Sequence, residues 1–235
     1  MSVGDVLGEA FDLYKRFFGR FVATAAVVFV VLDLISAIAD RASGTSVSSD
    51  LLWSLIALVF SFVGAFWLQG VLIEAVRDVR DGRADLTIPE LYERTRPHLL
   101  SLIGAGILAG LAIALGLVLL VVPGLFLLTR WALIPAVIVI EGRRAGESFD
   151  RSWQLTSGYG WTVFGSLLVA YLLYAVGQGV LRAIFAPLPH FAAIWVGGVV
   201  AHSITTPFIA AVGAVLYFRL ARLSVGVDPT PAPVQ

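Results

Sequence analysis

The chain has 235 residues, of which 59% are hydrophobic and only 14% are charged, and its formal net charge is zero. An ordinary soluble domain is about 45–50% apolar and about 25% charged, so a water-soluble fold of this size could not hide so much apolar surface. The composition therefore indicates an integral membrane protein, whose outside is solvated by lipid. It excludes disulfides and thiolate metal sites, because the chain has no cysteine.

The N-terminal segment, residues 3–18, is predicted to form an amphipathic surface helix. Its apolar residues recur at helical spacing on one face, and its charged residues occupy the other. Ser2 and Asp5 suit an N-terminal cap. A helix of this pattern directly before a membrane span is expected to lie in the membrane interface. The first span follows at residues 21–39 and contains Asp33.

The second span is predicted at residues 51–76, after a short polar loop. A second amphipathic helix, residues 87–98, begins with Thr87 and Glu90, which match a capping-box pattern. This helix leads into a third span at residues 99–122. Segments of these lengths suit a hydrocarbon core about 30 Å thick, which takes about 20 helical residues.

Pro123 and Gly124 are predicted to form a tight turn, so that the third span and a fourth span at residues 125–140 make a hairpin. A basic loop then leads into a third amphipathic helix at residues 145–157. A fifth span at 161–185 and a sixth span at 191–220 follow, and residues 226–235 are predicted to be a disordered tail. Residues 1–225 are thus expected to form one membrane domain.

The distribution of basic residues predicts the orientation of the chain in the membrane. Six spans place both ends of the chain on one side. Nearly all arginines and the single lysine fall on that side, whereas only Arg41 and Arg182 fall opposite. The positive-inside rule therefore predicts a multi-pass protein of the cell membrane with both ends in the cytoplasm.

The sequence also suggests an internal threefold repeat. Residues 8–12 (GEAFD) match residues 146–150 (GESFD), and residues 90–93 (ELYE) form a weaker third copy. Each copy lies on an amphipathic segment that is followed by two spans. Such parallel units would pack around an axis along the membrane normal. Chance similarity between amphipathic helices is the alternative interpretation.

Asp33 and Arg130 are charged residues predicted to lie within the membrane. Each lies six residues from the outer end of its span, which places it about 9 Å deep at 1.5 Å per residue. A paired charge costs much less there than a lone one, so we expect the two side chains to approach each other or to share a polar cavity. They would form part of a substrate or ion path, or a packing ion pair; Arg130 could also extend outward to the interface.

Polar residues also interrupt the last span, where His202, Thr205 and Thr206 precede Pro207. These three side chains could line a cavity at a proline kink. Alternatively, the hydroxyls could bond the carbonyls of the preceding helical turn.

The basic loop before the fifth span contains candidate lipid contacts. Arg143, Arg144 and Arg151 could bind anionic headgroups, although the positive-inside rule alone is enough to explain them. Known catalytic motifs and carboxylate-rich metal clusters are absent from the sequence, and its three histidines are scattered. We therefore expect no catalytic residues, metal or cofactor, and we do not expect an enzyme.

One stretch of the chain, residues 121–160, carries a family resemblance. The motifs are Pro123-Gly124-Leu125-Phe126, Arg130-Trp131, Pro135-Ala136-Val137, Glu141-Gly142 and Ser148-Phe149-Asp150-Arg151-Ser152-Trp153. They resemble the membrane domain of prokaryotic glycerophosphoryl diester phosphodiesterases and related stand-alone membrane proteins. Residues 4–21 and 215–220 fit the same pattern. The resemblance implies no activity, because those enzymes catalyse with a separate barrel domain and such a barrel needs about 250 residues.

The sequence therefore predicts an all-α polytopic membrane bundle of six transmembrane and three interfacial helices. We expect a non-enzymatic module that organises membrane lipids or a protein partner, including a second copy of itself, and no nucleic acid. A small-solute or lipid transporter or channel is the alternative, motivated by Asp33, Arg130 and the polar part of the last span. An enzyme acting on lipid phosphodiesters would rest on the resemblance alone.

Overall fold

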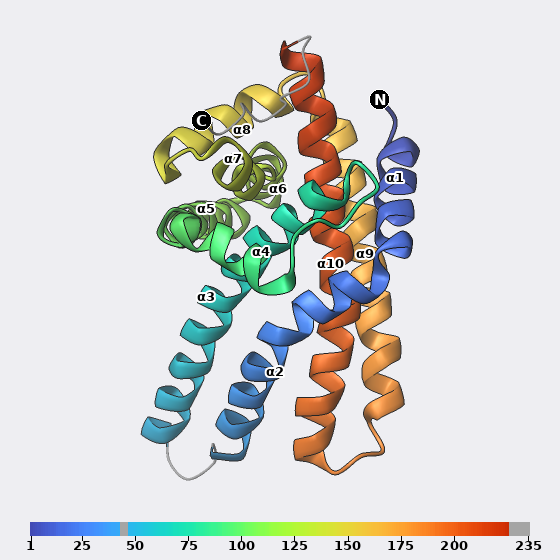
Figure 1. Cartoon of the computed structure of the whole chain (residues 1–235). Coiled ribbons are helices and arrows are strands. Elements are labelled where there is room, and N and C mark those ends of the chain that lie inside the picture. The colour runs from blue at the N-terminus through green and yellow to red at the C-terminus, as the bar shows by residue number, and fades with distance from the viewer. Residues whose placement is uncertain (43–46, 226–235) are drawn as a thin grey trace.

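The structure is a computed structural model that describes residues 1–42 and 47–225, and these residues are almost entirely α-helical (Figure 1). Part of the predicted polar loop and the whole predicted tail lie outside the described residues. The helices are α1 (Val3–Arg16), α2 (Phe18–Ala42), α3 (Val47–Val79), α4 (Ile88–Thr95), the 3-10 helix η1 (Arg96–His98), α5 (Leu99–Leu119), α6 (Val121–Arg130), α7 (Ile134–Glu141), α8 (Ala145–Thr156), α9 (Gly160–Phe185) and α10 (His190–Val225).

Six helical segments of the described chain are long and apolar enough to cross a membrane. This finding confirms the prediction of an all-α membrane bundle. The segments are Phe18–Ala42, Asp50–Val79, Ile88–Leu119, Val121–Glu141, Gly160–Phe185 and His190–Ser224.

The six segments do not form one parallel bundle. In Figure 1, α2, α3, α9 and α10 run along the length of the molecule, whereas α5, α6 and α7 are seen nearly end-on. The hairpin of α5 and α6 therefore lies across the four long helices. Because the middle hairpin is oriented differently from the first and the last, the chain does not adopt the predicted threefold arrangement, although the order of surface helix and hairpin does recur.

The turn between α5 and α6 is formed by Leu120, whose backbone is extended (φ −158°, ψ 133°). Pro123 and Gly124 lie in the first turn of α6 instead, so the prediction that they form the turn was wrong. Proline is accepted there because the first N–H groups of a helix have no partner within the helix. Gly124 has a different role: an added Cβ on Gly116 would lie 3.0 Å from the Gly124 Cα atom, so α5 and α6 are in backbone contact.

The amphipathic helix α1 packs along α9 and α10 rather than lying across the bundle (Figure 1). Val6 and Ala10 on its apolar stripe are fully buried. The Tyr14 hydroxyl donates a hydrogen bond of 2.6 Å to the carbonyl of Ile204 in α10, and burial raises the pKa of Tyr14 to about 12. The stripe that predicted an interfacial helix is thus used largely for contacts within the protein.

Both predicted capping patterns are formed. The Asp5 N–H donates to the Ser2 hydroxyl at 3.2 Å, and the Ser2 N–H donates to the Asp5 carboxylate at 2.9 Å. These bonds from Ser2 lower the pKa of Asp5. At the start of α4, the Thr87 N–H donates to Glu90 at 2.6 Å.

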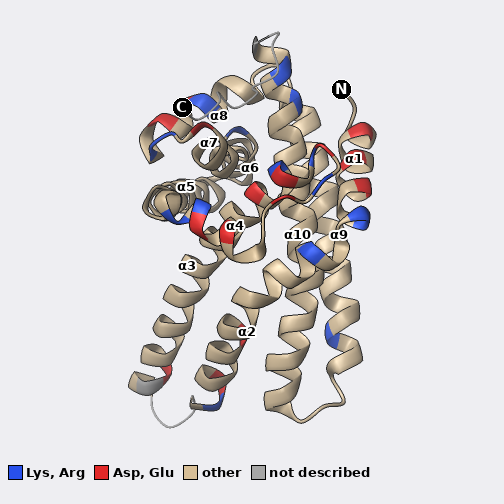
Figure 2. Ribbon diagram, viewed as in Figure 1, with Lys and Arg blue, Asp and Glu red and all other residues tan. Residues whose placement is uncertain are grey.

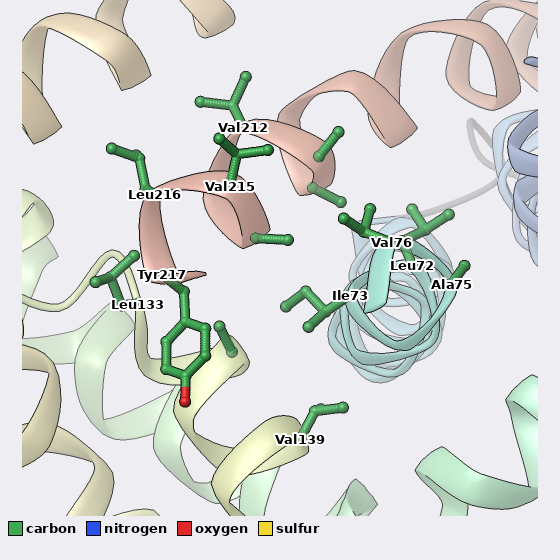
Figure 3. Packing of buried hydrophobic residues seen from close by; sticks show 14 of the residues in the cluster. Leu72, Ile73, Ala75, Val76, Leu133, Val139, Val212, Val215, Leu216 and Tyr217 are labelled. Atoms are coloured by element: carbon green, nitrogen blue, oxygen red, sulfur yellow. The ribbon is translucent and has the colours of Figure 1, made fainter. Parts of the chain in front are cut away.

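The core is built mainly where α3, α7 and α10 meet (Figure 3). Leu72 of α3 and Val212 and Leu216 of α10 are fully buried. Burying a side chain of this size contributes about 1.5–3 kcal/mol. Because α10 also packs on α2 and α9, it is the central helix that joins the long bundle to the crossing hairpin.

Charged residues gather at the end of the molecule that holds α1, α8 and the C-terminal end of α10 (Figure 2). Both described ends of the chain lie there (Figure 1). The opposite end, where α9 turns into α10, carries few charges. The sequence likewise predicts that most basic residues lie on one side of the membrane, so the two distributions agree.

Candidate functional site

Arg130 is the last residue of α6 and precedes a break in the helix. Its guanidinium lies 5.1 Å from the ring centroids of both Phe126 and Trp153. Its Nη1 atom is buried and has no hydrogen-bond partner in the part of the chain that the structure describes. Arginine keeps its charge under all ordinary conditions, so this site holds a cation that is stabilised by aromatic rings rather than by a carboxylate.

The surface helix α8 fixes the position of Arg130. The Ser152 hydroxyl donates to the carbonyl of Arg130 at 2.7 Å, and it accepts from the Leu133 N–H at 3.3 Å. The Thr156 hydroxyl also lies 3.4 Å from the same carbonyl. These bonds satisfy the backbone groups exposed by the break between α6 and α7. Arg130 is therefore held at the end of the molecule that carries α8.

A cavity of about 650 Å³ lies between α6 and the start of α9. Val122 is 76% exposed and Trp161 is 87% exposed, so the cavity opens on the surface of the protein. Arg130 is the only charged residue among the described residues that line it. The lining residues are Val122, Leu125, Phe126, Thr129, Arg130, Gly158, Gly160, Trp161 and Phe164.

Asp33 pairs with His202 and not with Arg130. Both carboxylate oxygens lie 3.1 Å from His202 Nδ1, and the Asp33 side chain is only 10% exposed. The predicted pairing was wrong because residues 125–140 are not one straight span: α6 ends at Arg130 and α7 begins at Ile134. The hairpin instead lies across the bundle and carries Arg130 to α8, whereas α10 lies beside α2 and brings His202 to Asp33.

Arg182 of α9, for which the sequence predicted only a position on the outer side of the membrane, completes a cluster of three. Its Nη2 atom lies 3.3 Å from His202 Nε2. A guanidinium only donates, so Nε2 accepts and Nδ1 carries the proton that is donated to Asp33. His202 therefore links the Asp33 carboxylate on α2 to the Arg182 guanidinium on α9.

Glycine makes room for the Asp33 carboxylate. A Cβ atom on Gly198 would lie 2.9 Å from Cγ of Asp33 and 3.0 Å from its Oδ1. Gly198 precedes His202 by one helical turn, so the two residues lie on the same face of α10. This glycine–histidine spacing was the sequence signal that, together with Asp33, could have indicated the pair.

Thr205 belongs to a second polar contact between α9 and α10. Its hydroxyl donates to the carbonyl of Ala201 at 2.7 Å and accepts from Gln178 Nε2 at 2.8 Å. The bond to the preceding turn was one of the two alternatives predicted for this residue. Among the described residues, Thr206 takes no part in these contacts. Beyond Pro207 the helix enters the apolar core, where Val212 and Val215 are buried, so the polar cluster does not continue to the highly charged end.

Two of the three arginines that were predicted to contact lipid form ion pairs within the protein. Arg143 and Arg151 donate to the Glu141 carboxylate at 2.6 Å and 3.0 Å, and the Tyr217 hydroxyl donates to it at 3.0 Å. Arg144 is exposed at the start of α8. Arg144 therefore differs from the other two arginines, because its side chain makes no ion pair with Glu141 among the described residues.

Within residues 1–42 and 47–225, no group of three or more histidine, aspartate or glutamate side chains is arranged to hold a metal ion. The features described so far define an α-helical membrane protein with a lateral cavity at its charged end. The chain belongs to the family described as Domain of unknown function (DUF7847), whose model matches residues 1–220. Neither a curated protein nor a solved structure matches the chain. These comparisons show no link to the glycerophosphoryl diester phosphodiesterases.

Proposed function

We propose that the protein is a non-enzymatic membrane module that holds a membrane lipid in the cavity between α6 and α9. The observation that carries this proposal is the cavity itself, about 650 Å³ in volume and lined mainly by apolar side chains. Pockets of about 300–1,000 Å³ are typical of sites for small organic ligands.

The surface around the cavity supports a lipid as the occupant. Leu119 and Val121, next to the hairpin turn, are 70% and 61% exposed, and Val118 is 83% exposed. Soluble proteins rarely expose large contiguous apolar patches. A cavity that opens on such a surface opens toward hydrocarbon, so an acyl chain can enter it without crossing water.

The charge distribution supports the orientation. The end of the molecule with α1 and α8 carries most of the arginines (Figure 2), and the positive-inside rule assigns such an end to the cytoplasm. The proposed location is therefore the cell membrane, with both ends of the chain in the cytoplasm and the cavity at the level of the inner leaflet.

Filling the cavity is expected to remove the bound lipid. A Cβ atom on Gly160, which lines the cavity, would meet no other atom within 4 Å, so Gly160→Phe places a ring in the cavity without a backbone clash. We expect native mass spectrometry of the detergent-purified protein to show lipid on the wild type and about tenfold less lipid on this variant, which corresponds to about 1.4 kcal/mol of binding.

Gly179→Phe is the matched control, because Gly179 lies on the same helix, also has open space around its Cα atom, and does not line the cavity. We expect this variant to retain lipid as the wild type does. Equal lipid retention by the wild type and Gly160→Phe would refute the proposed function.

A transporter is the second candidate, and the cluster of Asp33, His202 and Arg182 favours it, because ionisable groups within membrane helices often mark ion or proton paths. If this candidate is correct, proteoliposomes containing the protein should take up protons faster than empty liposomes, and His202→Phe should abolish the difference. Uptake no faster than in empty liposomes would exclude proton transport.

A further inference from the structure

Arg130, which lines the proposed lipid cavity, has no carboxylate partner among the described residues. Arg20, Arg151 and Arg219 each meet a carboxylate, on Asp78, Glu141 and Glu9 respectively. Arg130 instead contacts the rings of Phe126 and Trp153, and its Nη1 atom is buried without a partner among the described residues. Buried charged groups are generally paired, because an unpaired one loses its hydration without compensation.

The environment of Arg130 suits a phosphate group at the membrane interface. Trp161 is 87% exposed at the edge of the cavity and Trp153 is 40% exposed, and tryptophan is enriched where the headgroups meet the hydrocarbon. A guanidinium offers a planar fork of donors that matches phosphate oxygens. Leu125 and Phe164 continue the cavity wall with apolar surface, so the site offers a cation for a headgroup beside a wall for an acyl chain.

The first turn of α9 adds to the positive character of the site. Gly160 is the first residue of this helix of 26 residues and lines the same cavity as Arg130. The free N–H groups of a first helical turn favour an anion. None of the described lining residues is acidic, so the cavity offers no carboxylate to the amine of a zwitterionic headgroup.

From these contacts we infer that the cavity selects a lipid with an anionic phosphate headgroup and that Arg130 binds the phosphate. The inference rests on the proposed function, because it names the lipid that the cavity would hold. It moves the main lipid contact from the arginines of the loop before α8 to an arginine at the end of α6.

The test compares phosphatidylglycerol with phosphatidylethanolamine, added in detergent to the delipidated protein and followed by native mass spectrometry. The wild type is expected to prefer phosphatidylglycerol. Arg130→Met should lower its affinity for phosphatidylglycerol about tenfold or more, as expected for hydrogen bonds to a charged group. The same variant should lose less affinity for phosphatidylethanolamine, because the ammonium group of that headgroup already offsets the charge of its phosphate. Arg130→Lys, which retains the charge without the fork, should fall between the wild type and Arg130→Met.

Arg144→Met is the matched control, because it removes the same charge from an exposed residue close to α8. It should bind both lipids as the wild type does. An equal loss in Arg144→Met would indicate diffuse attraction to basic surface and would overturn the inference, as would an unchanged preference in Arg130→Met. Thermal unfolding of each variant in the same detergent confirms that the protein is folded.

Two further arms separate the possible outcomes. Inorganic phosphate at the same concentration should not displace phosphatidylglycerol; if it does, the site binds free phosphate and the inference of a lipid is wrong. If Gly160→Phe retains both lipids, the proposed function fails. If Gly160→Phe loses both lipids while Arg130→Met keeps its preference, only the role of Arg130 fails.

Discussion

Asp33→Leu is expected to lower the free energy of unfolding by about 3 kcal/mol, because removing one partner of a buried pair leaves the other without compensation. His202 would lose the acceptor of its Nδ1–H, which lies 3.1 Å away, and Arg182 would lose the negative charge that balances its own. The measurement is reversible unfolding in mixed micelles with increasing denaturing detergent.

Two companion variants make this prediction specific. Asp33→Asn keeps an oxygen that can accept from His202 and is expected to cost less, about 1 kcal/mol. The double variant Asp33→Leu/His202→Leu is expected to be less destabilised than the sum of its single variants, because residues in direct contact are coupled. Additive losses would show that the contact does not contribute to stability.

Gly116→Leu is expected to separate α5 from α6 and to destabilise the protein by about 1–3 kcal/mol, the usual cost of overpacking. The new Cβ atom would lie 3.0 Å from both the Cα and the N atom of Gly124. These are backbone atoms and cannot move aside as a flexible side chain can. Because α6 forms one wall of the cavity, lipid retention should fall together with stability.

Gly104→Leu tests whether any large residue on α5 has this effect, since a Cβ atom on Gly104 would meet no atom within 4 Å. We expect its unfolding transition to stay close to that of the wild type. If Gly104→Leu and Gly116→Leu unfold at the same detergent concentration as the wild type, the close contact between α5 and α6 has no energetic importance.

The polar residues show which features of such a protein can be predicted from its sequence and which cannot. Asp33 and His202 were each recognised, because a charged or titratable residue stands out in an apolar segment. Their pairing was not recognised, because the order of helices around a bundle is decided by packing between faces of similar apolar composition. The sequence predicts the wrong contacts for Arg130 for the same reason. It also predicts the wrong depth of Arg130 in the membrane, because nothing in the sequence indicated the helix break at 131–133.

The sequence by itself determined that the chain is a helical membrane protein, where its apolar segments lie, and where its helix caps form. These properties depend on composition and on spacing within one helix, which are local and leave a strong signal. Only the tertiary structure decided that α5 and α6 cross the long helices, that His202 meets Asp33, and that Arg130 lies in a cavity beside α8. Those contacts join residues far apart in the chain, and they follow from which surfaces pack closest, such as the glycines at 116, 124 and 198 that allow backbones and a carboxylate to approach.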